Sequence, residues 1–225
     1  MTDNQQLGRQ LSAEFFGSLI LVFTAISPII LGYNVLDTGI GLAVLMDAVA
    51  VGFVLFVLIE TLGPISGCHL NPAVTLAMVV AKQIDSHTAT RYVVVQIVGG
   101  LLGTLASHAM FIGHDFFQWI AISEVARGGG AFFAEFVGTF TLIVVIFGTI
   151  RNQSTQAGLI IGLLVGGFLI TTSSTMFANP QVTLARIFTW AMAGVRPLDA
   201  LIFIVVQIVA ALAGTRFSMY LFSME

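Results

Sequence analysis

The chain has 225 residues, of which 57% are hydrophobic and only 8% are charged, whereas soluble proteins carry roughly 25% charged residues. This composition excludes a soluble globular protein and predicts an integral membrane protein. The formal net charge is −3 and the few cations are scattered, which excludes an electrostatic nucleic-acid binder. The single cysteine, Cys68, cannot close an internal disulfide, and no Cys or His residues have metal-site spacing. We therefore expect neither a metal site nor a cofactor.

Long apolar stretches predict transmembrane helices, because about 20 apolar residues cross a hydrocarbon layer of roughly 30 Å. Six stretches approach or exceed this length, at residues 11–31, 40–62, 92–112, 131–150, 158–175 and 198–222. Residues 1–10 are polar and lead into the first stretch without a small-residue cleavage site, so we expect that span to act as the targeting signal. Two further apolar stretches, 71–82 and 179–193, are too short to cross alone, and each begins with Asn-Pro.

Three short motifs recur in the same order in the two parts of the chain. The matching pairs are AEF at 13–15 and 134–136, NPAVTLA at 71–77 and NPQVTLA at 179–185, and QIV at 96–98 and 207–209. We interpret residues 1–225 as a single membrane domain made of two homologous halves, near residues 1–112 and 124–225. Because each half crosses three times, the second half must enter from the opposite face, which makes an inverted repeat.

The cations on the loops predict the orientation in the membrane. With the amino terminus inside, five cations lie in the cytoplasm and three lie outside, a modest bias in the direction of the positive-inside rule. The five are Arg9, Lys82, Arg91, Arg151 and Arg216, and the three are Arg127, Arg186 and Arg196. We therefore expect a multi-pass protein of the cell inner membrane, surrounded by lipid, with both termini cytoplasmic.

The two Asn-Pro stretches predict half-helices. Asn is a preferred helix cap and Pro is favoured in the first helical turn. Eleven residues from Asn71 to Ala81 would span roughly 15 Å, half of the hydrocarbon thickness. In an inverted repeat the two amino-terminal ends meet near the midplane, where irregular backbone requires a polar path. A single Asn-Pro would be better explained as the cap of a surface helix, but two copies within NPxVTLA favour the half-helices.

The segments SGCHLNPAVTLA and ANPQVTLA resemble the paired loops of the aquaporin and glycerol-facilitator family. The resemblance implies an all-α membrane fold with six transmembrane helices plus two half-helices, a pore in each subunit of a homotetramer, and passive conduction of water or small uncharged solutes. It also implies roles for two groups of residues. The pore motifs are Asn71, Pro72 and Ala73 with Asn179, Pro180 and Gln181, and the loop-bracing residues are Glu14, Glu135 and His69.

The chain departs from the family at the outer filter. Members usually carry an arginine three residues after the second Asn, and here that position is Val182. The aligned filter position of the second span is Val51, and Met176 lies three residues before the second Asn. The fifth span contributes either Gly167 or Leu169, depending on the direction of counting. A filter of apolar or small residues predicts room for a bulky neutral solute.

Two charged residues lie one helical turn outside these filter positions. Asp47 precedes Val51 by four residues, and Arg186 follows Val182 by four. We expect them to face each other at the outer mouth, because a pair neutralises charge where a lone ion would be costly. The alternative is that Asp47 is solvated at the interface and Arg186 extends separately to the headgroups.

The sequence therefore predicts a passive channel for polyols, urea, neutral metalloid acids such as arsenite or methylated arsenicals, and water. An inverted-repeat secondary transporter is an alternative, but no titratable residue lies beside Asn71 or Asn179 to couple an ion. A weakly cation-permeable channel is a second alternative, given Asp47 at the mouth. We expect no enzymatic activity, because no nucleophile, base and oxyanion arrangement is visible.

Overall fold

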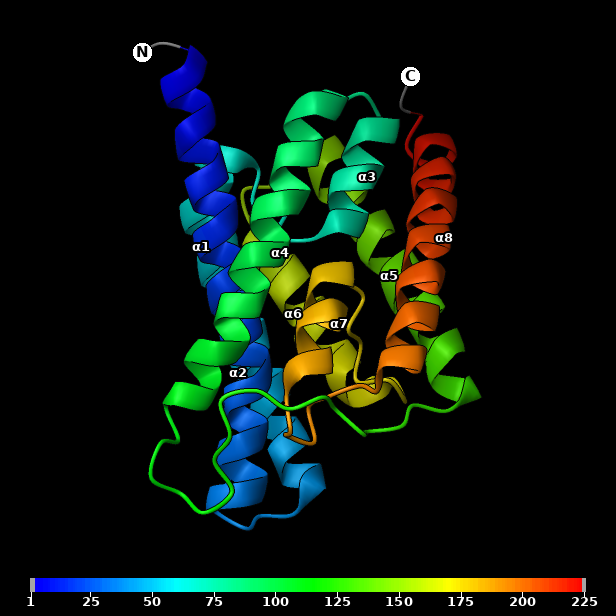
Figure 1. Cartoon of the computed structure of the whole chain (residues 1–225). Helices are drawn as coiled ribbons and strands as arrows, with labels where there is room; N and C mark the ends of the chain where they lie inside the picture. Colours follow the sequence, from blue (N-terminus) through cyan, green and yellow to red (C-terminus); the bar gives the residue numbers. More distant parts are fainter. Residues whose placement is uncertain (1–2, 224–225) are drawn as a thin grey trace.

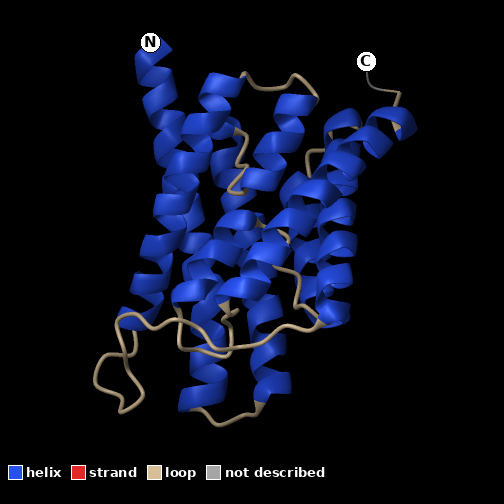
Figure 2. Cartoon of the chain, turned by 45° about the vertical axis from the view of Figure 1, so that its right-hand side comes forward, coloured by secondary structure: helices blue, strands red, loops and turns tan. Residues whose placement is uncertain are grey.

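The computed structural model describes residues 3–223, and this part of the chain is helical and contains no strand (Figure 2). Eight α-helices are joined by short turns, two irregular loops and one long connection. In chain order the elements are α1 (Asp3–Ile29), the π-helix η1 (Ile30–Val35), α2 (Ile40–Ser66), α3 (Pro72–Val80), α4 (Ser86–Ala109), α5 (Gly129–Arg151), α6 (Ala157–Thr171), α7 (Pro180–Ala185), the 3₁₀-helix η2 (Arg186–Phe188) and α8 (Pro197–Leu221).

Five of the described helices are long and apolar enough to cross a membrane: α1 continued by η1, α2, α4, α5 and α8. The predicted fifth span is α6, which has only 15 residues and ends at Thr171 rather than Thr175. At Thr172 the backbone becomes extended, and the Thr172 hydroxyl then accepts a hydrogen bond from the amide of Met176 at 3.0 Å. The last turn predicted for this span is therefore part of the second irregular loop.

The second half-helix is also shorter than the sequence predicted. The expected helix extended to residue 193, but α7 ends at Ala185 and only the 3₁₀ turn η2 follows. The reason lies in distant segments: the amide of Ser123 donates to the carbonyl of Ile187 at 2.7 Å, and the amide of Val195 donates to the carbonyl of Arg186 at 3.3 Å. These bonds use carbonyls that a longer helix would need for itself.

The helices pack in a pattern that relates the two parts of the chain. Helix α1 packs on α4 as α5 packs on α8, while α2 packs on α6, and the half-helices α3 and α7 contact α8 and α4 respectively. Figure 1 shows α1 beginning and α8 ending at the same end of the molecule, with the connection 110–128 running across the other end. The all-α fold with two half-helices is thus as predicted. The repeat limits near 112 and 124 stay a prediction, and residues 1–2 and 224–225 lie outside the described range.

Glycines bring α2 and α6 into backbone contact. A Cβ on Gly162 would lie 2.5 Å from the carbonyl oxygen of Gly52, and one on Gly166 would lie 2.8 Å from that of Ala48. Small residues at such a crossing let two membrane helices approach closely. On each of these two helices, the face next to the glycines lines a cavity between the helices, which is described below.

Candidate functional site

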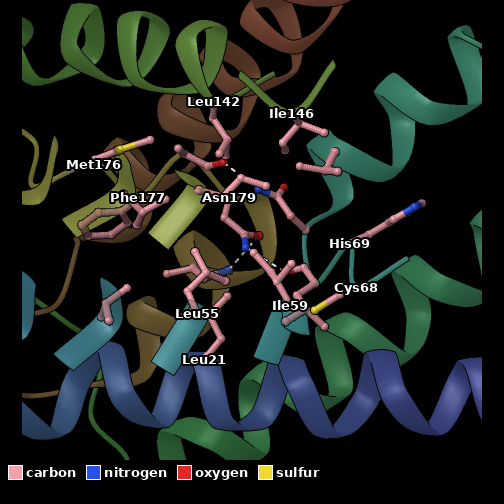
Figure 3. A pocket seen from close by; sticks show the side chains of 18 of the residues that line it. Leu21, Leu55, Ile59, Cys68, His69, Leu142, Ile146, Met176, Phe177 and Asn179 are labelled. Carbon is pink, nitrogen blue, oxygen red and sulfur yellow. Dashed lines mark hydrogen bonds between the residues drawn. The ribbon is translucent and has the colours of Figure 1, made fainter. Parts of the chain in front are cut away.

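A cavity of about 380 Å³ lies between the helices at the point where the two half-helices meet. Its walls come from α1, α2, α3, α5, α6, α7 and both irregular loops, and they are mainly apolar. The lining runs from Gln83, beyond the carboxyl end of α3, to Arg186, beyond the carboxyl end of α7. Figure 3 shows Asn179 in the middle of the view, with Met176 and Phe177 on one side. The cavity therefore extends past both half-helices.

The two asparagines connect the tips of the half-helices. The Nδ2 atom of Asn71 donates to the carbonyl of Ala178, and the Nδ2 atom of Asn179 donates to the carbonyl of Leu70, both at 2.8 Å. Each side-chain oxygen caps its own helix, accepting from Ala73 N in one case and Gln181 N in the other. An amide nitrogen has two hydrogens and only one crosses to the other loop. Since both asparagines line the cavity, the second hydrogen can be donated to a molecule there.

Both loops have a strained backbone immediately before the asparagine. Leu70 has φ 47° and Ala178 has φ 46°, a left-handed conformation that non-glycine residues rarely adopt. Cys68 and Met176 are left-handed as well, at 49° and 39°. Each such residue costs on the order of 1–3 kcal/mol, and the conformation persists only where the surroundings hold it in place.

Glu14 of α1 supplies that support for the first loop. Its side chain is fully buried and accepts four hydrogen bonds. The donors are the amides of His69 at 2.9 Å and Leu70 at 2.7 Å, the Ser66 hydroxyl at 2.6 Å and Gln96 Nε2 at 2.8 Å. The carboxyl group therefore fixes the strained residues that precede Asn71.

Glu135 of α5 supports the second loop in the way that Glu14 supports the first. It accepts hydrogen bonds from the amides of Phe177 at 2.8 Å and Ala178 at 2.7 Å, and from Gln207 Nε2 at 2.6 Å. His69, the third residue predicted to brace the loops, lines the cavity, and its Nδ1 atom lies 3.1 Å from the Thr75 hydroxyl oxygen.

The structure places three of the four predicted filter residues on the cavity wall. Val51, Met176 and Val182 line the cavity and are at most 5% exposed. Of the two fifth-span candidates, Leu169 lines the cavity and Gly167 does not. Leu169 continues a face of α6 that Ile161 and Val165 occupy at intervals of four residues.

Asp47 and Arg186 contact each other as the sequence predicted. The Arg186 Nη2 atom lies 3.4 Å from Asp47 Oδ2, and the two side chains are 3% and 2% exposed. Nη2 also donates to the carbonyl of Ala25. Arg186 lines the cavity, whereas Asp47 lies behind it.

Sequence reasoning missed Phe177 and Arg127. The Phe177 ring lines the cavity, with its centroid 4.3 Å from the Arg186 Cζ atom and 5.3 Å from that of Arg127. Arg127 lies near the end of the long connection 110–128, and its side chain donates a hydrogen bond to the carbonyl of Gly194 at 2.8 Å. Burial lowers the pKa of its guanidinium to about 10. Phe177 could have been suspected from its place two residues before the second Asn. The Arg127 contact has no local signal, because it depends on how the connection folds back.

A comparison with protein families matches residues 1–178 to the model for the major intrinsic protein. The chain belongs to the major intrinsic protein family. This family member is 32% identical to the aquaglyceroporin AqpS of Rhizobium meliloti over 92% of its own length and 88% of the relative's. It is 34% identical to the aquaporin AqpM of Methanothermobacter marburgensis over 73% and 76% of the two chains.

A solved structure shares the fold of this major intrinsic protein. The aquaglyceroporin from Plasmodium falciparum superposes with a TM-score of 0.73, over 97% of this chain and 100% of that one, at 18% sequence identity. At that identity the likeness shows the aquaporin fold alone. The family and the sequence relatives show that the protein is a passive membrane channel for water and small solutes and not an enzyme.

Proposed function

We propose that this channel conducts small uncharged solutes larger than water, with water as a further permeant. The solute classes are glycerol-like polyols, urea and neutral metalloid acids such as arsenite or methylated arsenicals. The observation that carries the proposal is that Val182, three residues after the second Asn, lines the cavity. The resemblance to the aquaporin and glycerol-facilitator family implies an arginine at this position in most members. Val51, Leu169 and Met176 line the same cavity as Val182. These apolar side chains offer no hydrogen-bond donors to water, and they leave more room for a partly apolar molecule than an arginine would.

The cavity walls favour uncharged over charged permeants. The lining is mainly apolar, with the amides of Asn71 and Asn179 among its few polar groups. An ion would lose its hydration there without a compensating charge, whereas a neutral oxygen can accept a hydrogen bond from an asparagine. We infer that Asp47 and Arg186, paired at 3.4 Å, keep the outer mouth neutral. The relative named an aquaglyceroporin supports the same solute size.

We also propose the setting in which the channel works. The helices expose many large apolar side chains, Phe53 at 66% and Leu163 at 65% among them, which suits contact with lipid or with further subunits of a homotetramer. The five cations that the sequence assigns to the cytoplasm support an inner-membrane protein with cytoplasmic termini. The repeat limits 1–112 and 124–225 belong to the same proposal.

The proposed solute range can be tested with purified protein in liposomes. We expect stopped-flow light scattering to detect glycerol, urea and arsenite entry faster than in protein-free vesicles. Val182→Arg adds bulk and donors at the constriction, so it should slow glycerol and urea much more than water. A protein that passes water but excludes glycerol and every metalloid acid would contradict the wide constriction.

A further inference from the structure

Gln181 links the second half-helix to the first loop without lining the cavity. Its side chain is buried, at 1% exposed, and it is absent from the cavity wall. Its Nε2 atom donates to the carbonyl of Leu70 at 3.2 Å, and the same oxygen accepts a hydrogen bond from the Nδ2 atom of Asn179 at 2.8 Å. The amino-terminal end of α7 is therefore fastened to the first loop by two hydrogen bonds that share one acceptor.

The first half-helix has no second link of this kind. The carbonyl of Ala178 accepts a hydrogen bond from the Nδ2 atom of Asn71 at 2.8 Å, and no other side chain within residues 3–223 donates to it. The residue of the first motif that corresponds to Gln181 is Ala73, whose side chain has no donor. The two halves therefore differ at this position, although their asparagines make the same bond.

A glycine on α4 provides the space for the Gln181 side chain. The matching segments QIVGG at 96–100 and QIVAA at 207–211 place Gly100 in one half where Ala211 lies in the other. A Cβ on Gly100 would overlap Gln181 Oε1, whereas Ala73 and Ala211 belong to one apolar cluster. The Oε1 atom is buried and has no hydrogen-bond partner in the described part of the chain. An unpaired buried acceptor is destabilising, so this glutamine needs an explanation.

The shortness of α7 explains why a second link matters. Helix α7 has six residues, whereas α3 has nine. Its carboxyl end is held where the Thr104 hydroxyl donates to the carbonyl of Ala185 at 3.2 Å. At the amino-terminal end, a single bond from Asn179 would let the helix turn about that bond, and the Gln181 bond prevents this turn. The next residue, Val182, lines the cavity, so the orientation of α7 determines where Val182 lies.

We propose that Gln181 is a positioning residue that fixes the orientation of α7 and thereby the width of the passage at Val182. With both bonds to Leu70 in place, Val182 keeps its position on the wall. Without the Gln181 bond, displaced arrangements of α7 become populated and longer solutes pass. The inference rests on the proposed function, to which it adds a residue that sets the upper size limit of the solute.

The test compares wild-type protein with the double variant Gly100→Ala/Gln181→Ala, which gives the second half the pair of alanines found in the first. Stopped-flow light scattering on liposomes measures the entry of glycerol and of erythritol, the next longer linear polyol. We expect the ratio of erythritol to glycerol permeability to rise about fivefold, the shift in an equilibrium that one neutral hydrogen bond produces. An unchanged ratio in a folded double variant would overturn the proposal.

A second measurement tests the link whatever solutes the channel passes. Asn71→Ala leaves the carbonyl of Ala178 without a side-chain donor, whereas Asn179→Ala leaves the Gln181 bond in place, and each removes the cap of one half-helix. We therefore expect Asn71→Ala to lower the midpoint of thermal unfolding in detergent more than Asn179→Ala does. The loss caused by Asn179→Ala should become larger in the background of the double variant. An equal loss in both backgrounds would show that Gln181 does not hold α7.

Gln118→Ala is the matched control, because Gln118 is an exposed glutamine of the long connection. It should leave the permeability ratio and the midpoint at their wild-type values, and a rise equal to that of the double variant would overturn the role of Gln181. If gel filtration shows that the double variant does not fold, Gln181→Met decides, because methionine fills the space beside Gly100 and has no donor. A wild-type ratio in Gln181→Met would then contradict the proposal. Wild-type protein that passes no polyol contradicts the proposed function, and the unfolding comparison still decides the link.

Discussion

At the scale of single residues, the molecule depends on two buried carboxyl groups that hold strained backbone. Glu14 and Glu135 accept the amides of Leu70 and Ala178, the left-handed residues that precede the two asparagines. Without these acceptors the amides would be buried and unpaired in an apolar interior. The asparagine geometry is therefore a consequence of side chains that lie more than 40 residues away in sequence.

Replacing one of these carboxyl groups tests that dependence. Glu14→Gln substitutes an amide nitrogen for one oxygen, so the donors that met this oxygen now face another donor. We expect a loss of about 1–3 kcal/mol in stability, seen as a lower midpoint of thermal unfolding in detergent, together with slower solute flux. Glu124→Gln, at an exposed residue of the long connection, is the matched control. Equal midpoints for the two variants would contradict the bracing role.

Gln181 provides a second residue-scale test, because its side chain occupies the space that a side chain on Gly100 would fill. Its Nε2 atom donates to the carbonyl of Leu70 at 3.2 Å, and a Cβ on Gly100 would overlap its Oε1 atom. Gly100→Ala should therefore displace Gln181 and destabilise the fold by about 1–2 kcal/mol, and Gln181→Ala should remove most of that cost. The coupling is measured by thermal unfolding of both single variants and the double variant. Strictly additive effects would show that the two residues do not interact.

At the scale of elements, the width of the cavity depends on how closely α2 approaches α6. Gly162 and Gly52 allow their backbones to touch, and the adjacent helix faces, which carry Val51 and Leu169, then line the cavity. Adding side-chain volume at the crossing would move these faces apart. The glycines therefore act on the passage although they do not line it.

Two alanine substitutions on α6 distinguish a glycine that packs against α2 from a glycine that was a candidate for the cavity wall. Gly162→Ala places a methyl group 2.5 Å from the Gly52 carbonyl oxygen, and we expect it to cost about 1–3 kcal/mol by overpacking. Gly167→Ala meets no atom within 4 Å, so its unfolding midpoint should be unchanged or slightly raised. Thermal unfolding measures both. A large loss of solute flux in Gly167→Ala would return Gly167 to the filter in place of Leu169.

At the scale of the whole molecule, much of the architecture could be predicted because it depends on local sequence patterns. Apolar length gave the long helices, and the doubled Asn-Pro motif gave the half-helices. The ends of α6 and α7 could not be predicted, since they depend on distant hydrogen bonds such as the one from Ser123 to Ile187. Leu169 could have been chosen over Gly167 from its four-residue spacing with Val165. The contact of Arg127 with Phe177 depends on the path of the long connection, which no short-range pattern specifies.

The tips of the two half-helices border one cavity, and we propose that uncharged solutes cross the membrane through it without energy coupling. The most direct measurement is stopped-flow glycerol entry into liposomes that contain the purified wild-type protein. We predict a rate that rises linearly with the glycerol gradient, exceeds that of empty vesicles, and is unchanged by a proton gradient or membrane potential. Glycerol entry no faster than in empty vesicles, or accumulation driven by an ion gradient, would contradict a passive channel for uncharged solutes.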